Sequence, residues 1–222
     1  MKNMNLIFDF DSTIIKIETI DLISSISLNL HPQKNDIINN IQKITNQAME
    51  GKISFDKALN MRIKMIQANK DHIKEAKEII KKNITNSFIK NKKFLINNSE
   101  KCYIVSGGFT EIIIPIAKML NIKESHVFGN DFIYNHSGYI TGINKTNILS
   151  QDKGKVNIVN KIKGNSIIIG DGYTDYEIKK YNPKNQFIQF VENINRKNLN
   201  QYADLIANNL LEVIEYLKNN EF

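Results

Sequence analysis

Two carboxylates directly follow a short apolar run near the start of the chain. Asp9 and Asp11 come after Leu6–Phe8, which has the length and composition of a buried strand. In a parallel α/β sheet, ligands bind beyond the carboxyl ends of the strands. Two acids at that place repel each other unless a positive charge lies beside them, and Mg²⁺, which prefers oxygen ligands, would supply it. The pair therefore predicts metal-assisted phosphate chemistry.

Two later apolar runs also end in polar residues. Ser106 and Gly107 close one of them, and a hydroxyl with open backbone amides before a helix can hold an oxyanion or a phosphate. Asp171 and Asp175 stand on a glycine-flanked turn after the other run, where they suit a metal ligand and its support. Each group alone is also compatible with an ordinary tight turn.

A lysine lies between these two groups in the sequence. Lys153 directly precedes a glycine at the start of a predicted helix, and its charge could neutralise a phosphate and the crowded carboxylates. Lys155 and Lys145 are alternatives for the same place. No packing requirement would bring an acid pair, a Ser-Gly turn, a lysine and a second acid pair to one sheet edge, so the combination favours a phosphate site.

The elements that would position these groups alternate between strand and helix. Short apolar runs predict strands at Asn5–Phe8, Lys101–Val105, Ser166–Ile169 and Gln186–Phe190. Helical patterns lie at Thr110–Leu120, Lys155–Lys163 and Leu210–Lys218, and a small hairpin is expected from His126–Phe132 and Gly138–Thr141. The alternation predicts the α/β class: a Rossmann-like parallel sheet with helices on both faces.

A long helical insertion separates the first two strands. It reads as helices at Glu18–Ser27, Lys34–Met49, Ser54–Gln67 and Asp71–Lys82, with Ser54 as a candidate N-cap. We expect a core domain of residues 1–15 and 83–222 and a helical-bundle cap of residues 16–82. Because the insertion follows the acidic strand end directly, it would hang over the site as a lid.

Composition bounds the function classes. The 222 residues are 41% hydrophobic and 24% charged, as in an ordinary globular protein, with a net charge of +7. The lysines are scattered and only Arg62 and Arg196 are arginines, which argues against nucleic acid binding. Cys102 sits in an apolar run and reads as a buried hydrophobe. No apolar stretch approaches the roughly 20 residues of a membrane span, and we expect a cytoplasmic protein.

These motifs, in this order, resemble those of the haloacid dehalogenase superfamily of phosphotransferases. The matching residues are Asp9–Thr13, Ser106–Gly108, Lys153 and Gly170–Asp175. The resemblance implies that Asp9 is a nucleophile that forms an aspartyl-phosphate and that Asp11 is the general acid and base.

The same resemblance implies the ligands of metal and phosphate. Mg²⁺ would be held by Asp9, by the backbone carbonyl of Asp11 and by Asp171, with Asp175 in support. The phosphoryl group would be held by Ser106, Gly107 and Lys153. Thr174 stands where many relatives have Asn, and its shorter side chain can still donate to a carboxylate or a phosphate.

The insertion resembles that of the phosphoserine phosphatases within this superfamily. Glu18 would hold the ammonium group of the substrate and Arg62 its carboxylate, because arginine binds carboxylate with a two-pronged fork. Met49 and Phe55 would form an apolar wall beside them. The implied activity is hydrolysis of O-phospho-L-serine to serine and phosphate, the last step of serine biosynthesis.

Other functions remain open on these residues. Phosphohomoserine, phosphoethanolamine or a methionine-salvage intermediate could replace phosphoserine as the substrate. A non-catalytic phospho-aspartate receiver shares the acid cluster but lacks a large helical insertion. We expect a small phosphorylated amino acid as the partner, no nucleic acid, no membrane, and a monomer or homodimer.

Overall fold

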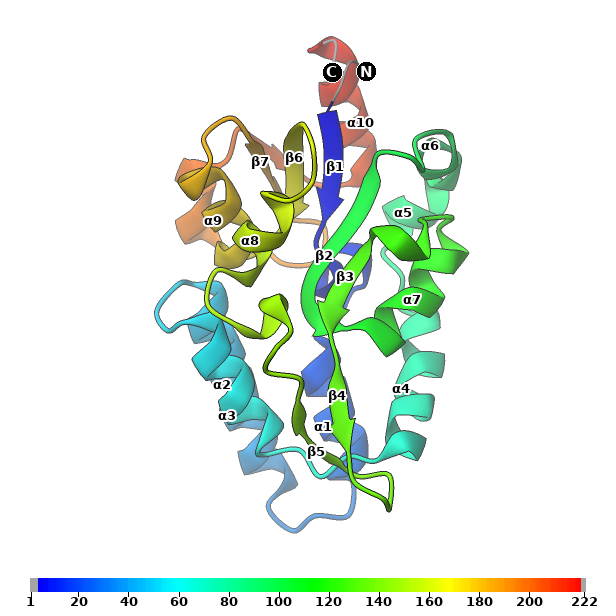
Figure 1. Ribbon diagram of the computed structural model, residues 1–222, viewed down its shortest axis with the longest axis vertical. Helices are drawn as coiled ribbons and strands as arrows, with labels where there is room; N and C mark the ends of the chain where they lie inside the picture. Colours follow the sequence, from blue (N-terminus) through cyan, green and yellow to red (C-terminus); the bar gives the residue numbers. More distant parts are fainter. Residues whose placement is uncertain (1–3, 221–222) are drawn as a thin grey trace.

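A parallel sheet forms the centre of the fold (Figure 1). The structure is a computed structural model and describes residues 4–220. Within these residues the main sheet has six strands in the order β3-β2-β1-β6-β7-β8, and every pair is parallel. The strands are β1 (Met4–Phe8), β2 (Cys102–Phe109), β3 (Val127–Asn130), β6 (Asn165–Gly170), β7 (Gln186–Phe190) and β8 (Leu205–Ala207). The predicted α/β class is confirmed.

Both faces of the sheet are covered, which explains why its strands are apolar runs rather than alternating ones. Leu6 and Phe8 pack into one buried cluster, whereas Ile7 between them packs into the other. The first face carries α5 (Asn86–Lys90), α6 (Lys92–Asn97), α7 (Thr110–Met119) and α10 (Leu210–Asn219). The second face carries α8 (Gly154–Val159) and α9 (Tyr173–Tyr181).

A helical unit lies beyond the carboxyl ends of the strands. Its helices are α1 (Thr19–Ser27), α2 (Lys34–Met49), α3 (Phe55–Ile63) and α4 (Lys70–Lys81). Figure 1 shows the arrow of β1 pointing toward this unit, with α10 at the opposite end of the molecule. Ser54 takes the N-cap position of α3, although its side chain makes no capping hydrogen bond. We call this unit the cap; its division from the core at residues 16–82 stays a prediction.

The predicted hairpin is wrong in its first half. Val127–Asn130 is the edge strand β3, parallel to β2, and the hairpin is instead formed by β4 (Phe132–Tyr134) and β5 (Ile140–Ile143). The apolar run is split at Asp131, whose carboxylate accepts hydrogen bonds from Thr110 at 2.9 Å and from Asn147 at 3.0 Å. These bonds hold the chain where it leaves the main sheet.

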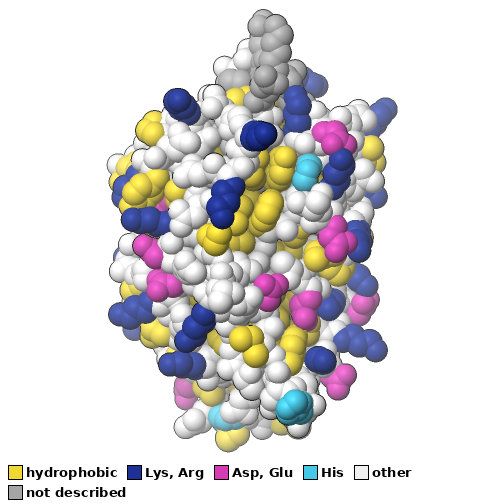
Figure 2. Space-filling model, in the orientation of Figure 1, with side chains coloured by type: hydrophobic (Ala, Val, Ile, Leu, Met, Phe, Trp, Pro, Cys, Tyr) yellow, Lys and Arg dark blue, Asp and Glu magenta, His cyan; other side chains and the backbone are white. Residues whose placement is uncertain are grey.

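The charges on the surface and the burial of Cys102 agree with the interpretation of the composition. On the face shown in Figure 2, basic side chains are dispersed and acidic ones lie among them. Cys102 is fully buried in β2, as its apolar neighbours predict. Among residues 4–220, no helix combines the length and the hydropathy that a membrane span requires.

Candidate active site

Asp9 occupies the end of the central strand. Its backbone N–H donates to the carbonyl of Ile169 at 2.9 Å, which continues the pairing of β1 with β6. The next amide, of Phe10, donates to Oδ1 of Asp9 at 2.7 Å and fixes the carboxylate. Only 5% of Asp9 is exposed, so this charge is buried and needs partners.

Three carboxylates meet at this edge of the sheet. Oxygen atoms of Asp9, Asp171 and Asp175 all lie within 4.8 Å of one another, and all three residues are buried. β1 and β6 are neighbours in the sheet, so their carboxyl ends bring these acids together as the sequence predicts. Gly170 permits the approach, because a Cβ there would lie 2.3 Å from the Asp175 carboxyl group.

Burial makes the charged form of this cluster unfavourable. It raises the pKa of Asp171 to about 7 and that of Asp175 to about 8, and the charge of Asp9 adds to both shifts. Hard oxygen ligands in a buried anionic cluster are the donor set that a divalent cation prefers. The three carboxylates could therefore hold a divalent metal ion.

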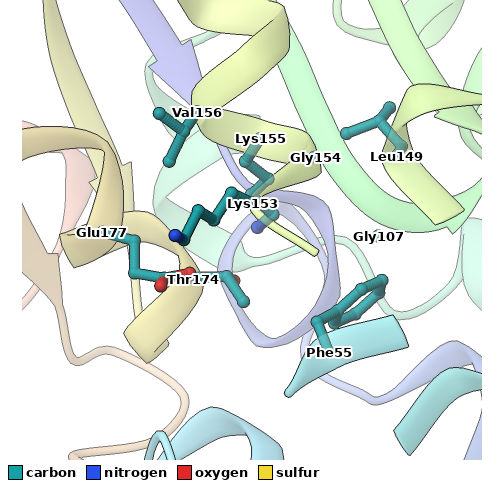
Figure 3. A pocket seen from close by; sticks show the side chains of 9 residues that line it. All are labelled: Phe55, Gly107, Leu149, Lys153, Gly154, Lys155, Val156, Thr174 and Glu177. Carbon is teal, nitrogen blue, oxygen red and sulfur yellow. The ribbon is translucent and has the colours of Figure 1, made fainter. Parts of the chain in front are cut away.

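Lys155, not Lys153, is the lysine of this cluster. The Nζ atom of Lys155 lies 2.8 Å from Oδ1 of Asp9 and 2.8 Å from Oδ1 of Asp175. Its side chain is buried, and the two carboxylates raise its pKa despite the opposing effect of burial. Figure 3 shows that the two lysines direct their ammonium groups apart, with that of Lys153 toward Glu177.

The start of α8 explains why the prediction of Lys153 is wrong. Lys153 is exposed in the N-cap position with a φ of 55°, and its Nζ atom lies 4.5 Å from the centre of the Tyr181 ring. Gly154 packs tightly against the preceding turn, since a Cβ there would lie 2.5 Å from the carbonyl oxygen of Ile148. This packing presents Lys155, rather than Lys153, to the end of β1.

Arg196 is a second cation that the sequence reasoning missed at this place. Its Nε donates to Oδ2 of Asp171 at 2.9 Å, and its Nη2 lies 3.7 Å from Oε1 of Glu18. Its Nη1 donates to Asn46 of α2 at 3.2 Å. Arg196 thus joins the acid cluster to the cap. Arg62 and Arg196 are the two arginines of a lysine-rich chain, and this scarcity is the signal in the sequence that could have pointed to Arg196.

Asp11 faces the site from the segment that follows Asp9. Both the backbone N–H and the hydroxyl of Thr19 donate to its Oδ1. Its Oδ2 faces the other side, 3.7 Å from where a Cβ on Gly108 would lie. Burial, followed by the nearby charge of Glu18, raises the pKa of Asp11 well above its usual value. A carboxyl group with a raised pKa keeps its proton to a higher pH than an ordinary aspartate does.

Asn193 supports the same segment from the loop after β7. Its side-chain amide donates to the carbonyl of Ser12 at 3.0 Å and to the hydroxyl of Thr85 at 2.7 Å. Longer contacts of the amide reach the carbonyls of Thr13 and Ile15. Ser12 has a φ of 55°, so the amide braces a strained turn between the two acids and the cap.

Ser106, Gly107 and Gly108 lie near the end of β2, and Oδ2 of Asp11 faces this segment. Ser106 is buried, and its Oγ accepts the backbone N–H of Gly108 at 2.9 Å. Phe55 of the cap packs directly on Gly107: a Cβ there would lie 2.2 Å from Cζ of Phe55. Only glycine allows this contact, which closes the cap against the core.

The cap adds two opposite charges to the same cavity. Arg62 is buried, with its Nη1 donating to Thr45 at 3.0 Å, and Glu18 accepts the hydroxyl of Ser12 at 2.7 Å. The cavity has a volume of about 20 Å³, room for about one water. Its other predicted lining residues are Asp9, Asp11, Met49, Phe55, Ser106, Gly107 and Thr174, and Lys155 joins them.

Thr174 is placed between this cavity and its neighbour. It lines both the central cavity and the adjoining pocket of Figure 3, and only 7% of it is exposed. Its hydroxyl oxygen is buried and has no hydrogen-bond partner. A buried hydroxyl left in this state is available to a ligand.

Proteins described as phosphoserine phosphatases or as similar to them resemble this chain in sequence and in fold. The chain is 26% identical to phosphoserine phosphatase from Bos taurus over 216 residues, which cover 95% of this chain and 92% of the bovine one. The crystal structure of a phosphoserine phosphohydrolase-like protein from Francisella tularensis superposes with a TM-score of 0.87 and 31% identity, covering 96% and 99% of the two chains. A structure described as a phospho-aspartyl intermediate analogue of phosphoserine phosphatase has a TM-score of 0.77 and 27% identity, covering 97% and 99%.

The family model of the haloacid dehalogenase-like hydrolases matches residues 6–178, a range that contains Asp9, Ser106, Lys155 and the Asp171–Asp175 turn. This match includes the cap and the sheet edge described above. The chain is therefore an enzyme that belongs to the haloacid dehalogenase-like hydrolase family.

Proposed function

We propose that this enzyme hydrolyses O-phospho-L-serine to L-serine and phosphate with Mg²⁺ as its cofactor. The observation that carries the proposal is the lining of one cavity by both a phosphoryl site and a pair of opposite charges. Asp9, Ser106 and Lys155 are suited to a phosphate, while Glu18 and Arg62 are suited to an ammonium and a carboxylate. A phosphorylated amino acid needs both sets. The similarity to phosphoserine phosphatases supports the same substrate.

The first half of the reaction would transfer the phosphoryl group to Asp9. An Asp9 carboxylate oxygen attacks phosphorus, the bond from phosphorus to the serine oxygen breaks, and Asp11 gives its proton to the departing oxygen. The raised pKa of Asp11 suits this role, because the acid must begin protonated. The relative described as a phospho-aspartyl intermediate analogue supports an aspartyl-phosphate here.

The second half would release phosphate. Asp11, now a carboxylate, takes a proton from water as the water oxygen attacks phosphorus, and the bond from phosphorus to Asp9 breaks. Lys155, the Ser106 hydroxyl, the Gly107 amide and Thr174 would hold the transferred group in both halves. The unpartnered hydroxyl of Thr174 supports its part in this.

Mg²⁺ would be held by Asp9, by the backbone carbonyl of Asp11 and by Asp171, with Asp175 supporting the site through Lys155. When bound, it supplies positive charge that offsets the charge on the phosphoryl oxygens. The residues of this chain do the remaining work: Arg62 and Glu18 orient the amino acid, and Met49 and Phe55 exclude water. The cap, residues 16–82, would act as the lid.

A phosphate-release assay tests the substrate. With Mg²⁺, we expect phosphate to be released faster from L-phosphoserine than from any alternative substrate. The alternatives are D-phosphoserine, phosphothreonine, phosphohomoserine, phosphoethanolamine and a methionine-salvage intermediate. Arg62→Ala should lower kcat/KM for L-phosphoserine by about 10²-fold, since a charge-assisted contact is worth roughly 1.5–3 kcal/mol, and should leave p-nitrophenyl phosphate nearly unchanged. Preference for phosphoethanolamine, or equal loss on both substrates in Arg62→Ala, would contradict the proposal.

A further inference from the structure

The turn between α2 and α3 rests on an aromatic ring of the core. A Cβ built on Gly51 would lie 2.7, 2.8 and 2.9 Å from Cδ2, Cγ and Cε2 of Tyr173. Gly51 also has a φ of 74°, which side chains rarely allow. Glycine is therefore required here for two reasons, and the ring of Tyr173 lies flat against the backbone of the turn. Figure 1 shows this turn beside α9.

The ring is fixed from the core side. The Nζ of Lys180 donates to the Tyr173 hydroxyl at 3.0 Å, and the ring of Tyr176 meets that of Tyr173 edge-on with centres 5.7 Å apart. Tyr173 is the first residue of α9, and its neighbour Thr174 lines the catalytic cavity. Tyr173 therefore stands on the rim of the site as a supported surface rather than a free side chain.

The turn on this surface connects two walls of the cavity. Met49 precedes Gly51, and its Sδ would lie 2.8 Å from a Cβ on Gly172. Phe55 follows the turn and packs on Gly107. Both side chains line the cavity of about 20 Å³. A contact that holds Gly51 in place therefore also holds Met49 and Phe55, the two side chains that close the cavity.

The rest of the cap is tied to the core by backbone hydrogen bonds. Amides of Lys70 and Ile140 bond across the junction between the α3–α4 linker and the β4–β5 hairpin, at 3.1 and 2.9 Å. The root of the cap is held by the bond from Lys16 to Asn83 at 2.9 Å. At the α2–α3 turn, by contrast, the amides of Gly51 and Lys52 bond within the turn, to Ala48 and Gln47. Within residues 4–220, this end is held by side-chain contacts alone, namely the packing on Tyr173 and the hydrogen bond from Arg196 to Asn46, and it is the part that can lift.

We propose that Tyr173 is a positioning residue that holds the α2–α3 turn over the site and so favours small substrates. Met49 and Phe55 close the cavity at this end, so the turn lifts when a substrate enters and settles again on Tyr173 afterwards. Loss of the ring weakens the closed state by about three- to tenfold, the usual worth of an aromatic contact. Only the choice of substrate in the test rests on the proposed function.

The first test needs no substrate. Hydrogen exchange of the Lys52 amide is measured in wild type, Tyr173→Ala, Tyr173→Phe and Gly51→Ala, with the exposed Tyr181→Ala as the control on the same helix. We expect exchange about three- to tenfold faster in Tyr173→Ala and in Gly51→Ala, and wild-type rates in Tyr173→Phe and Tyr181→Ala. Unchanged exchange in Tyr173→Ala, or equal acceleration in Tyr181→Ala, would overturn the proposal.

The second test separates closure from general damage. Tyr173→Ala should raise KM for L-phosphoserine about three- to tenfold with kcat little changed, and leave kcat/KM for p-nitrophenyl phosphate at or above the wild-type value. Tyr173→Phe should restore the wild-type KM. Equal losses on both substrates would contradict selection by closure. If wild type does not hydrolyse phosphoserine, the proposed function fails, whereas the exchange result still decides the role of Tyr173.

Discussion

At the scale of single residues, the two lysines beside Gly154 show what spacing can and cannot predict. The sequence indicates that a lysine enters the acid cluster, because three buried carboxylates need cations. It does not indicate which one. The choice depends on the packing of Gly154 against Ile148, which turns Lys155 inward and leaves Lys153 at the surface. That contact is tertiary, and no local pattern reports it.

The two lysines provide a matched pair of variants. We predict that Lys155→Met lowers kcat by about 10²–10³-fold, the usual cost of removing a group that stabilises a transferred phosphoryl charge. Lys153→Met should stay within about twofold of wild type, as expected for an exposed side chain. Both are measured by phosphate release at saturating substrate. A larger loss in Lys153→Met than in Lys155→Met would return the role to Lys153.

Arg196 and Arg62 also show which site residues a sequence motif can identify and which it cannot. Both are buried, and they are the two arginines of the chain. Arg62 was identified because its neighbours resemble a known motif. Arg196 lies outside any motif, yet its guanidinium contacts Asp171, Glu18 and Asn46. In a lysine-rich chain, a retained arginine marks a place where the geometry of the fork is used.

At the scale of elements, the long periodic segments were the most predictable. The pattern of Lys34–Met49 matches α2 at both ends, and Thr110–Leu120 matches α7 to one residue. The predicted Lys155–Lys163 is longer than α8, which ends at Val159. The short strand β8 was not predicted. It has three residues, which are too few to show the alternation of apolar and polar side chains, and it forms because it pairs with β7.

The loop after β7 could not have been assigned a role from its sequence. It has no helical or strand period, but it supplies Asn193 and Arg196 to the two sides of the site. Asn193 donates hydrogen bonds to the carbonyls of Ser12 and Thr13, which lie 181 and 180 positions earlier in the sequence. Such contacts depend on β7 lying beside β6 in the sheet, an order that the sequence leaves open.

At the scale of the whole molecule, the buried acids link metal binding to stability. Burial raises the pKa of Asp171 to about 7 and of Asp175 to about 8, above their ordinary value of 3.8. The metal-free folded chain therefore binds more protons than the unfolded chain from about pH 4 to about pH 8. Its free energy of unfolding should fall as pH rises through this window. A cation bound by Asp171 and Asp175 would supply the positive charge that these carboxylates lose with their protons. It would therefore oppose the decrease in the free energy of unfolding.

Thermal unfolding checks this link. Without divalent cations we predict a lower Tm at about pH 8 than at about pH 6, and a larger rise on adding Mg²⁺ at the higher pH. In Asp171→Asn the Mg²⁺ effect should be much smaller. A Mg²⁺-induced rise of equal size at both pH values, or one that survives in Asp171→Asn, would contradict a metal site at these carboxylates.

Phosphate release from O-phospho-L-serine by wild type and Asp9→Asn tests whether Asp9 is the nucleophile of a Mg²⁺-dependent phosphatase. The exposed Asp36→Asn is the matched control, and circular dichroism verifies folding. We predict that Asp9→Asn loses at least about 10³-fold in kcat while remaining folded, and that Asp36→Asn keeps wild-type activity. Substantial turnover by a folded Asp9→Asn would contradict the aspartyl-phosphate mechanism.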